Sequence, residues 1–218
     1  MNNLELCRLC RSENTSIFYV DDDSNFGKTF FLCNNCKLIF VAEELLPEPE
    51  VEKDRYLSHN NDVEDLEYQS FLSKLWNPME KRLTKGASGL DYGAGPGPAL
   101  MHMMSLSGYS VKMYDPFFAI DEAVLNKTYD FIVCTETAEH FHHPSKDFDQ
   151  FDQMLNRNGF LGVMTSFTDN VECFGNWYYR RDPTHVSFYA SYTMQWIAEK
   201  MNWKVDLMKD NVVIFFKD

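Results

Sequence analysis

The sequence predicts an α/β fold in which helices flank a mostly parallel sheet, behind a small N-terminal β module. Three observations indicate this fold. An apolar residue leads into the glycine-rich residues 90–100 (LDYGAGPGPAL) and a Met-rich apolar segment follows, an order typical of strand, tight turn and helix. The apolar run at residues 129–134 suits a buried parallel strand. Two closely spaced cysteine pairs precede residue 40 and lie outside this pattern.

Length and composition favour a soluble protein with one main domain. With 218 residues, 44% of them hydrophobic, the chain can build a full α/β domain and a small appendage. It has no run of eighteen apolar residues and no basic segment followed by an apolar one at its start, so we expect a cytoplasmic protein. The net charge of −13 disfavours nucleic acid and membrane surfaces as partners, because both are bound through clustered Lys and Arg.

Residues 1–45 are expected to form a zinc-ribbon-like module. Twenty-two residues separate two C-x-x-C pairs, a spacing close to that of a structural Cys₄ zinc site, whose ligands here would be Cys7, Cys10, Cys33 and Cys36. The β-prone residues 17–20 and 29–32 predict a hairpin between the pairs, turned at residues 21–25. Disulfides and a thiol cluster without metal are the alternatives.

The acidic residues 41–52, with Pro47 and Pro49, predict an extended segment, and we place a linker at 46–61. The main domain then spans residues 62–218. Its first element is an amphipathic helix between residues 62 and 85, interrupted near Pro78. Tyr56 and Tyr68 are expected to contribute to core packing more than to a ligand site.

The glycine turn departs from the dinucleotide-binding pattern, because its third glycine comes one residue early. An aspartate before it suggests that the bound group is partly cationic. Residues 91–97 resemble the D-x-G-x-G-x-G first motif of the class I S-adenosylmethionine-dependent methyltransferases, which implies a Rossmann-like sheet with an antiparallel last strand. The resemblance implies cofactor contacts from Asp91, Gly93, Ala94, Gly95 and Gly97. A tight connection without a ligand is the alternative.

Asp115 follows the predicted second strand, residues 110–114, where nucleoside-binding folds hold the ribose hydroxyls. A solvated loop aspartate is the alternative. The interval from Asp115 to Asp130 is too short for the full helix, strand and loop that the family places there. The sequence therefore does not predict which residues form the adenine pocket.

A second resemblance follows the strand at 129–134. Glu136, Glu139, His140 and Pro144 match the family's F-D-x-I-x-x-x-E-x-x-E-H segment and the proline after it. This implies that Glu136 lines the cofactor and that His140 lies near the methyl group. We then expect a helix at 145–156, a strand at 160–166, a helix at 192–201, and strands at 203–207 and 212–216 joined by a turn at 209–211.

The long loop at residues 167–187 is expected to contact the methyl acceptor, because long loops in compact domains are usually functional. It carries the candidate acceptor contacts Trp177, Tyr178, Arg180 and Arg181. His185 lies in a segment that resembles the D-x-T-H segment of small-molecule methyltransferases. A helix cap for His185 and a solvent-facing arginine pair are the alternatives.

These patterns predict methyl transfer from S-adenosylmethionine to a small-molecule acceptor, with an anionic group on the acceptor as one option. His140 and His185 are the candidate bases, since a neutral imidazole can accept a proton near pH 7. An RNA methyltransferase with a zinc-binding front module and a non-catalytic interaction module with the same fold are the rivals. The sequence leaves the oligomeric state open.

Overall fold

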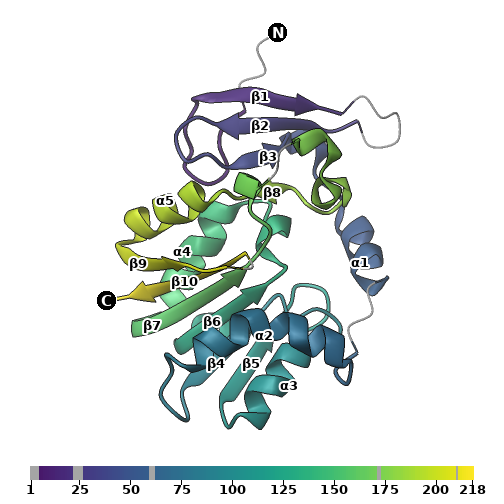
Figure 1. The fold of residues 1–218 in the computed structure, drawn as a ribbon. Coiled ribbons are helices and arrows are strands. Elements are labelled where there is room, and N and C mark those ends of the chain that lie inside the picture. Colours follow the sequence, from purple (N-terminus) through teal and green to yellow (C-terminus); the bar gives the residue numbers. More distant parts are fainter. Residues whose placement is uncertain (1–4, 22–26, 59–61, 171–172, 210) are drawn as a thin grey trace.

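The computed structural model describes residues 5–21, 27–58, 62–170, 173–209 and 211–218. A small N-terminal sheet lies above a larger sheet, and the helix α1 (Pro49–Leu57) descends beside both (Figure 1). Within the described part of the chain, no helix combines the length and the apolar character that crossing a bilayer requires.

The larger sheet has the strand order β5-β4-β6-β7-β10-β9. Its strands are β4 (Ser88–Tyr92), β5 (Ser110–Tyr114), β6 (Tyr129–Thr135), β7 (Leu155–Met164), β9 (Trp203–Leu207) and β10 (Val212–Lys217). The first four are mutually parallel, whereas β10 is antiparallel to both of its neighbours. The predicted fold class is therefore confirmed. Asp210, in the predicted turn before β10, lies outside the described residues.

Two pairs of helices cover the two faces of this sheet (Figure 1). α2 (Leu66–Glu80) and α3 (Ala99–Leu106) pack on one face, and α4 (Pro144–Met154) and α5 (Ser191–Met201) pack on the other. Side chains alternate along β6: Phe131 and Val133 join the α2–α3 core, whereas Ile132 and Cys134 join the α4–α5 core. This alternation explains the continuous apolar run in the sequence.

Three boundaries differ from the prediction. α2 continues through Pro78 and ends at Glu80, so the proline lies in its last turn. α4 ends at Met154, two residues early, and β7 begins at Leu155 with an irregular pairing to β6 before it becomes regular at Phe160. All residues between Asp115 and Tyr129 are described and contain only the short 3₁₀ helix Glu122–Asn126 and no strand, as the short interval indicated.

The predicted hairpin of the N-terminal module is confirmed as β1 (Thr15–Val20) paired with β2 (Thr29–Cys33); residues 22–25 of its turn lie outside the described residues. β3 (Ile39–Val41) continues the sheet, and β8 (Ser187–Phe188) adds a fourth strand from the far end of the chain. The module and the loop after β7 thus share one sheet and one apolar cluster.

The expectation of an extended segment at 41–52 was wrong, because residues 49–57 form α1. Pro49 occupies the first turn of the helix. Backbone N–H groups there have no acceptor within the helix, so the N–H that proline lacks is not missed. Glu50 and Glu52 in the same turn interact favourably with the positive end of the helix dipole. The proline that indicated a break therefore begins a helix.

Candidate functional site

A cavity of about 1240 Å³ opens at the carboxyl ends of the parallel strands β4, β5 and β6. Ligands bind at this edge in open α/β sheets. Its walls come from the glycine turn, the end of β6, α1, α2 and the loop at 178–185. The sequence-predicted residues among its lining are Gly93, Ala94, Gly95, Asp115, Glu136, His140, Tyr178, Arg181 and His185.

The glycine turn brings backbone to the cavity surface. Gly93 and Gly95 have φ values of 80° and 64°, a region that side chains disfavour. A Cβ at Gly93 would lie 2.2 Å from the Thr137 side chain, so this position has no room for one. The Gly93 N–H donates to the Tyr114 carbonyl at 2.8 Å and so joins the turn to the end of β5.

Asp115 is buried at the end of β5 and faces this turn. One carboxylate oxygen accepts from the Gly95 N–H at 2.9 Å, and the other accepts from the N–H groups of Phe117 and Phe118 at 2.9 and 3.1 Å. The alternative of a solvated loop aspartate is therefore excluded. Because each carboxylate oxygen has two lone pairs, the oxygen that accepts from Gly95 can accept one further hydrogen bond, from a ligand hydroxyl in the cavity.

Asp91 and Gly97 do not line the cavity, although the sequence resemblance implied that both contact the cofactor. Asp91 is 4% exposed and lies beneath the turn. Burial raises the pKa of its carboxyl to about 7, and a hydrogen bond from the Met101 backbone in α3 offsets this only in part. Asp91 therefore supports the turn from below.

A pH-dependent stability follows for Asp91. Its folded-state pKa exceeds that of an unfolded chain, so the folded state loses stability as pH rises from about 4 through about 7. Asp91→Asn removes this loss. We therefore expect the unfolding free energy of the variant, relative to wild type, to be about 3 kcal/mol higher at pH 8 than at pH 5. Urea denaturation of both proteins at the two pH values measures the difference, and a pH-independent difference would contradict the assignment.

Glu136 directly follows β6 and lines the cavity, with a backbone φ of 47° that is unusual for a residue with a side chain. Burial, and then the nearby Glu139 charge, raise the pKa of its carboxyl to about 9, while Lys74 acts in the opposite direction. A cationic ligand would favour the carboxylate form. The cavity thus contains a carboxyl group that can ionise when a cation binds.

His140 and His185 both line the cavity and approach each other, with ring centroids 4.8 Å apart. The Nδ1 atom of His140 lies 3.0 Å from the Thr184 carbonyl oxygen, and that of His185 lies 2.7 Å from the Tyr179 carbonyl oxygen. Burial lowers the pKa of His185 to about 4, so its imidazole is neutral at pH 7. The residue before α5 is Ala190, so His185 does not cap that helix.

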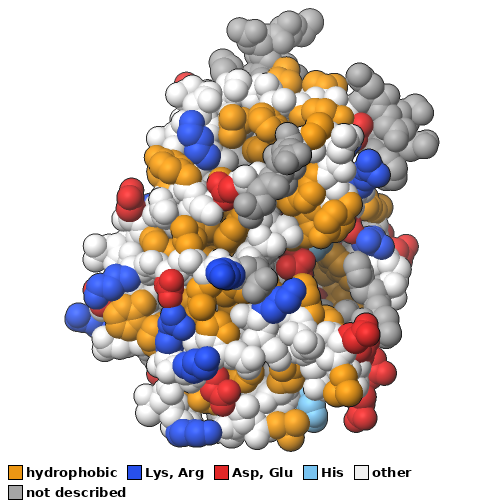
Figure 2. Space-filling model, in the orientation of Figure 1, with side chains coloured by type: hydrophobic (Ala, Val, Ile, Leu, Met, Phe, Trp, Pro, Cys, Tyr) orange, Lys and Arg blue, Asp and Glu red, His pale blue; other side chains and the backbone are white. Residues whose placement is uncertain are grey.

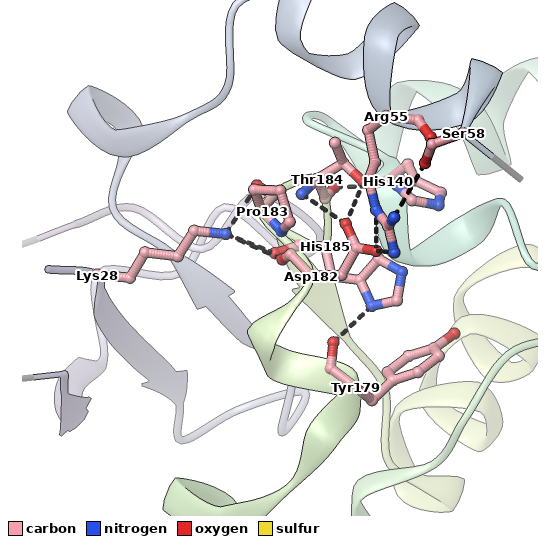
Figure 3. A network of polar contacts seen from close by, with 9 residues as sticks. All are labelled: Lys28, Arg55, Ser58, His140, Tyr179, Asp182, Pro183, Thr184 and His185. Carbon is pink, nitrogen blue, oxygen red and sulfur yellow. Dashed lines mark hydrogen bonds and ion pairs between the residues drawn. The ribbon is translucent and has the colours of Figure 1, made fainter. Parts of the chain in front are cut away.

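The loop around His185 is tethered from two other elements (Figure 3). The Asp182 carboxylate accepts from Arg55 of α1 at 2.8 Å and from the Thr184 hydroxyl at 2.7 Å. The Lys28 ammonium of the N-terminal module donates to the Pro183 carbonyl at 2.8 Å. The position of His185 therefore depends on α1 and on the N-terminal module.

The structure does not bring Arg180 and Trp177 to the cavity. The Arg180 guanidinium is 7% exposed, pairs with Asp21 at 2.5 Å and donates to the carbonyls of Phe174 and Gly175. Trp177 packs against the module's apolar cluster. Adjacent residues in a 3₁₀ turn point in different directions, so only Arg181 of the arginine pair lines the cavity. Arg180 fastens the loop to the N-terminal sheet.

Arg180→Ala should therefore lower the free energy of unfolding by about 3 kcal/mol, because it leaves a mostly buried Asp21 carboxylate without this partner. Arg181→Ala is the matched control and should change stability by less than about 0.5 kcal/mol, since its side chain is exposed. Chemical denaturation of the two variants gives the comparison. Equal stability losses would show that the Arg180 contacts are not the source.

Several lining residues were not predicted. Tyr56 of α1 and Tyr68 of α2 line the cavity, although core packing was the expectation, and Tyr179 contacts His185 at a centroid distance of 4.2 Å. Nothing in the local sequence distinguishes a cavity tyrosine from a core tyrosine. The position of Glu139 in the second motif was the only available signal for this residue, which also lines the cavity.

The four cysteines of the N-terminal module converge on one point. Their sulfur atoms lie within 4.8 Å of one another, with 3.5 Å between Cys7 and Cys36 and 3.4 Å between Cys10 and Cys33. All four are free thiols, so the disulfide alternative is not what the structure has. Tetrahedral zinc with bonds of about 2.3 Å places sulfurs roughly 3.8 Å apart. The donor set and its spacing therefore fit a zinc ion.

Comparisons with known proteins agree with this geometry. A family profile described as a methyltransferase domain matches residues 63–207, about two thirds of the chain. No curated protein matches the sequence.

Three solved structures share the fold at low sequence identity. The Burkholderia thailandensis 1,6-didemethyltoxoflavin N1-methyltransferase, solved with 1,6-didemethyltoxoflavin and S-adenosylhomocysteine, has a TM-score of 0.57 and 12% identity over 93% of this chain and 99% of its own. An Archaeoglobus fulgidus S-adenosylmethionine-dependent methyltransferase gives 0.53 and 13% over 68% and 94%. One from Aquifex aeolicus gives 0.50 and 15% over 78% and 98%.

The profile match contains the glycine turn, Asp115 and the end of β6, which are the parts of the main sheet that line the cavity. The chain therefore belongs to the methyltransferase domain family, and it is an S-adenosylmethionine-dependent methyltransferase with a class I fold.

Proposed function

We propose that this enzyme methylates a small molecule that enters the cavity beside His140 and His185. One observation carries the proposal: a single cavity is lined both by the glycine turn with Asp115 and by the loop at 178–185. At about 1240 Å³ it exceeds the 300–1,000 Å³ range that is usual for one drug-sized ligand. It therefore has room for a cofactor together with a compact acceptor.

In this proposal the cofactor lies along the glycine turn. Backbone at Gly93, Ala94 and Gly95 lies against it, and the Asp115 carboxylate accepts a hydrogen bond from a ribose hydroxyl. Glu136, with its raised pKa, becomes ionised when a cationic amino or sulfonium group approaches.

The reaction is an in-line displacement, in which an acceptor lone pair takes the methyl group from the sulfonium and neutral S-adenosylhomocysteine leaves. Positioning of the acceptor contributes most of the rate in such a step. Each histidine donates its Nδ1–H to a backbone carbonyl, which leaves an Nε2 lone pair to accept the acceptor's proton. Tyr178 and Arg181 are the proposed acceptor contacts on the loop.

A small acceptor is supported over RNA by the walls and the charge. Both α1 and the loop at 178–185 line the cavity, and the Arg55–Asp182 ion pair joins them. On the face drawn in Figure 2, Lys and Arg side chains stand among acidic and hydrophobic ones instead of forming one basic stripe. With a net charge of −13, the surface repels a polyanion. The Burkholderia enzyme was solved with 1,6-didemethyltoxoflavin, a small molecule.

We also propose that the four cysteines hold one structural zinc ion. The Cys10 and Cys36 N–H groups lie 3.5 Å from the sulfurs of Cys7 and Cys33, so both pairs direct backbone hydrogen bonds at thiolates. Arg8 is buried beside Cys7; its guanidinium has an ion pair with Glu43 at 3.6 Å but no hydrogen-bond partner among the described residues. A buried cation there offsets the negative charge of a zinc ion with four thiolates.

The test is methyl transfer from S-adenosylmethionine labelled on the methyl group, offered separately with a low-molecular-weight extract, total RNA and total protein from the source cells. We expect label in small molecules. Label in RNA alone would support the RNA-methyltransferase rival instead. The same incubation with the Gly95→Val variant controls for contaminating enzymes.

A further inference from the structure

We infer that Glu139, His140 and His185 form a second metal site, which binds a divalent cation inside the acceptor end of the cavity. The inference rests on the proposed function only for the role of the cation, and the site itself can be tested without any acceptor. One ligand atom from each residue lies within 4.8 Å of the other two. All three side chains line the cavity, and none belongs to the cysteine cluster.

Both histidines are already oriented as metal ligands. Backbone carbonyls accept from Nδ1–H of each ring, at 3.0 Å for His140 and 2.7 Å for His185. Metal-binding histidines usually donate their second ring N–H in this way, which fixes the tautomer and aims the other nitrogen at the metal. The Nε2 lone pairs of both rings are consequently available in the cavity, and Figure 3 shows the His185 ring held by the Tyr179 carbonyl.

Glu139 supplies an independent sign of a missing partner. Its side chain is 1% exposed, and the Thr165 hydroxyl donates to one carboxylate oxygen at 2.9 Å. The other oxygen, Oε1, is buried and has no hydrogen-bond partner among the described residues. Leaving a buried carboxylate oxygen unpaired costs free energy, and a cation at this point removes that cost.

Two imidazole nitrogens and one carboxylate oxygen suit zinc, iron or manganese in the divalent state. With bonds of about 2.0–2.2 Å, the three ligand atoms must draw together by roughly one to two ångströms, a movement within the range of side-chain rotamers. Three protein ligands leave coordination positions open, which is the pattern of sites that bind a substrate or water.

The open positions suit an acceptor that carries a hydroxyl group. A hydroxyl oxygen bound at such a cation loses its proton to water more readily. Its lone pair then forms the bond to the methyl carbon while the carbon–sulfur bond breaks, and neutral S-adenosylhomocysteine leaves. In this arrangement the imidazoles act as metal ligands in place of the base role proposed above, water takes the proton, and an oxygen becomes the methylated atom.

Manganese(II) is the appropriate probe, because thiolate clusters such as the four-cysteine site do not favour it. Electron paramagnetic resonance of free Mn²⁺ during titration of the full chain should show one bound equivalent. Glu139→Gln and His185→Gln should each weaken Mn²⁺ binding by at least 100-fold. His142→Gln is the matched control, since His142 lines the same cavity but pairs with Glu52, and it should bind Mn²⁺ as wild type does.

The affinity for S-adenosylhomocysteine, measured on every variant, reports whether the cavity is intact. Wild-type protein that binds no Mn²⁺ at millimolar concentration, or a Glu139→Gln variant that binds it unchanged, would overturn the metal site. If wild-type protein does not bind S-adenosylhomocysteine, the proposed placement of the cofactor is wrong. The Mn²⁺ titration would still decide the metal site.

Discussion

Gly95→Val is expected to weaken binding of S-adenosylhomocysteine by at least 1,000-fold, about 4 kcal/mol. Gly95 has a φ of 64° and lines the cavity, so a branched side chain there both strains the backbone and fills the space beside the ligand. The same residue donates its N–H to Asp115, and a shift of the turn would break that contact too. Isothermal titration calorimetry gives the affinity.

Gly108→Val is the matched control for backbone strain. Gly108 has a φ of 88° after α3, and a Cβ there meets no atom within 4 Å. The two variants should lose similar amounts of stability, whereas only Gly95→Val should lose affinity. Equal affinities in the two variants would mean that the ligand does not lie against the glycine turn.

Removal of the proposed zinc ion should unfold the N-terminal module. Zinc binding contributes about 10–16 kcal/mol in comparable small domains, more than the apolar cluster of so small a sheet can replace. We expect Cys33→Ser, or a strong chelator, to release one equivalent of zinc and to expose residues 5–45 to protease. The zinc content of the purified chain and the proteolysis pattern are the measurements.

The loss of folded structure should extend from the module to the loop at 178–185 and no further. β8 pairs with β3, and Lys28 holds the carbonyls of the loop at 182–185, so the loop depends on a folded module. The glycine turn follows β4, which belongs to the other sheet. Affinity for S-adenosylhomocysteine should therefore change by less than about tenfold while turnover is lost. Chelation that leaves both the proteolysis pattern and turnover unchanged would contradict a structural metal.

The sequence predicted the main sheet well because its signals are local. A few adjacent residues are enough to predict the conformation of the glycine turn, of the apolar strand β6 and of the closing hairpin. The α1 helix was missed because Pro49 was interpreted as a break, when the first turn of a helix is a position that proline favours.

Contacts between distant segments could not be predicted in this way. The pairing of Ile39 with Phe188 joins residues almost 150 positions apart, and a two-residue strand has no pattern of its own. The Arg180 side chain points away from the cavity because it pairs with Asp21, which lies in the N-terminal module. Local sequence also does not reveal that Asp91 lies under the turn while Asp115 faces it.

The most direct test of cofactor binding at the glycine turn is calorimetric titration of the wild-type chain with S-adenosylhomocysteine, repeated with Asp115→Ala. We expect one equivalent to bind wild type with micromolar or tighter affinity, and the variant to bind at least 10-fold more weakly because a ribose hydroxyl loses its acceptor. Absence of saturable binding at millimolar ligand, or equal affinities in the two proteins, would contradict the placement of the cofactor in this cavity.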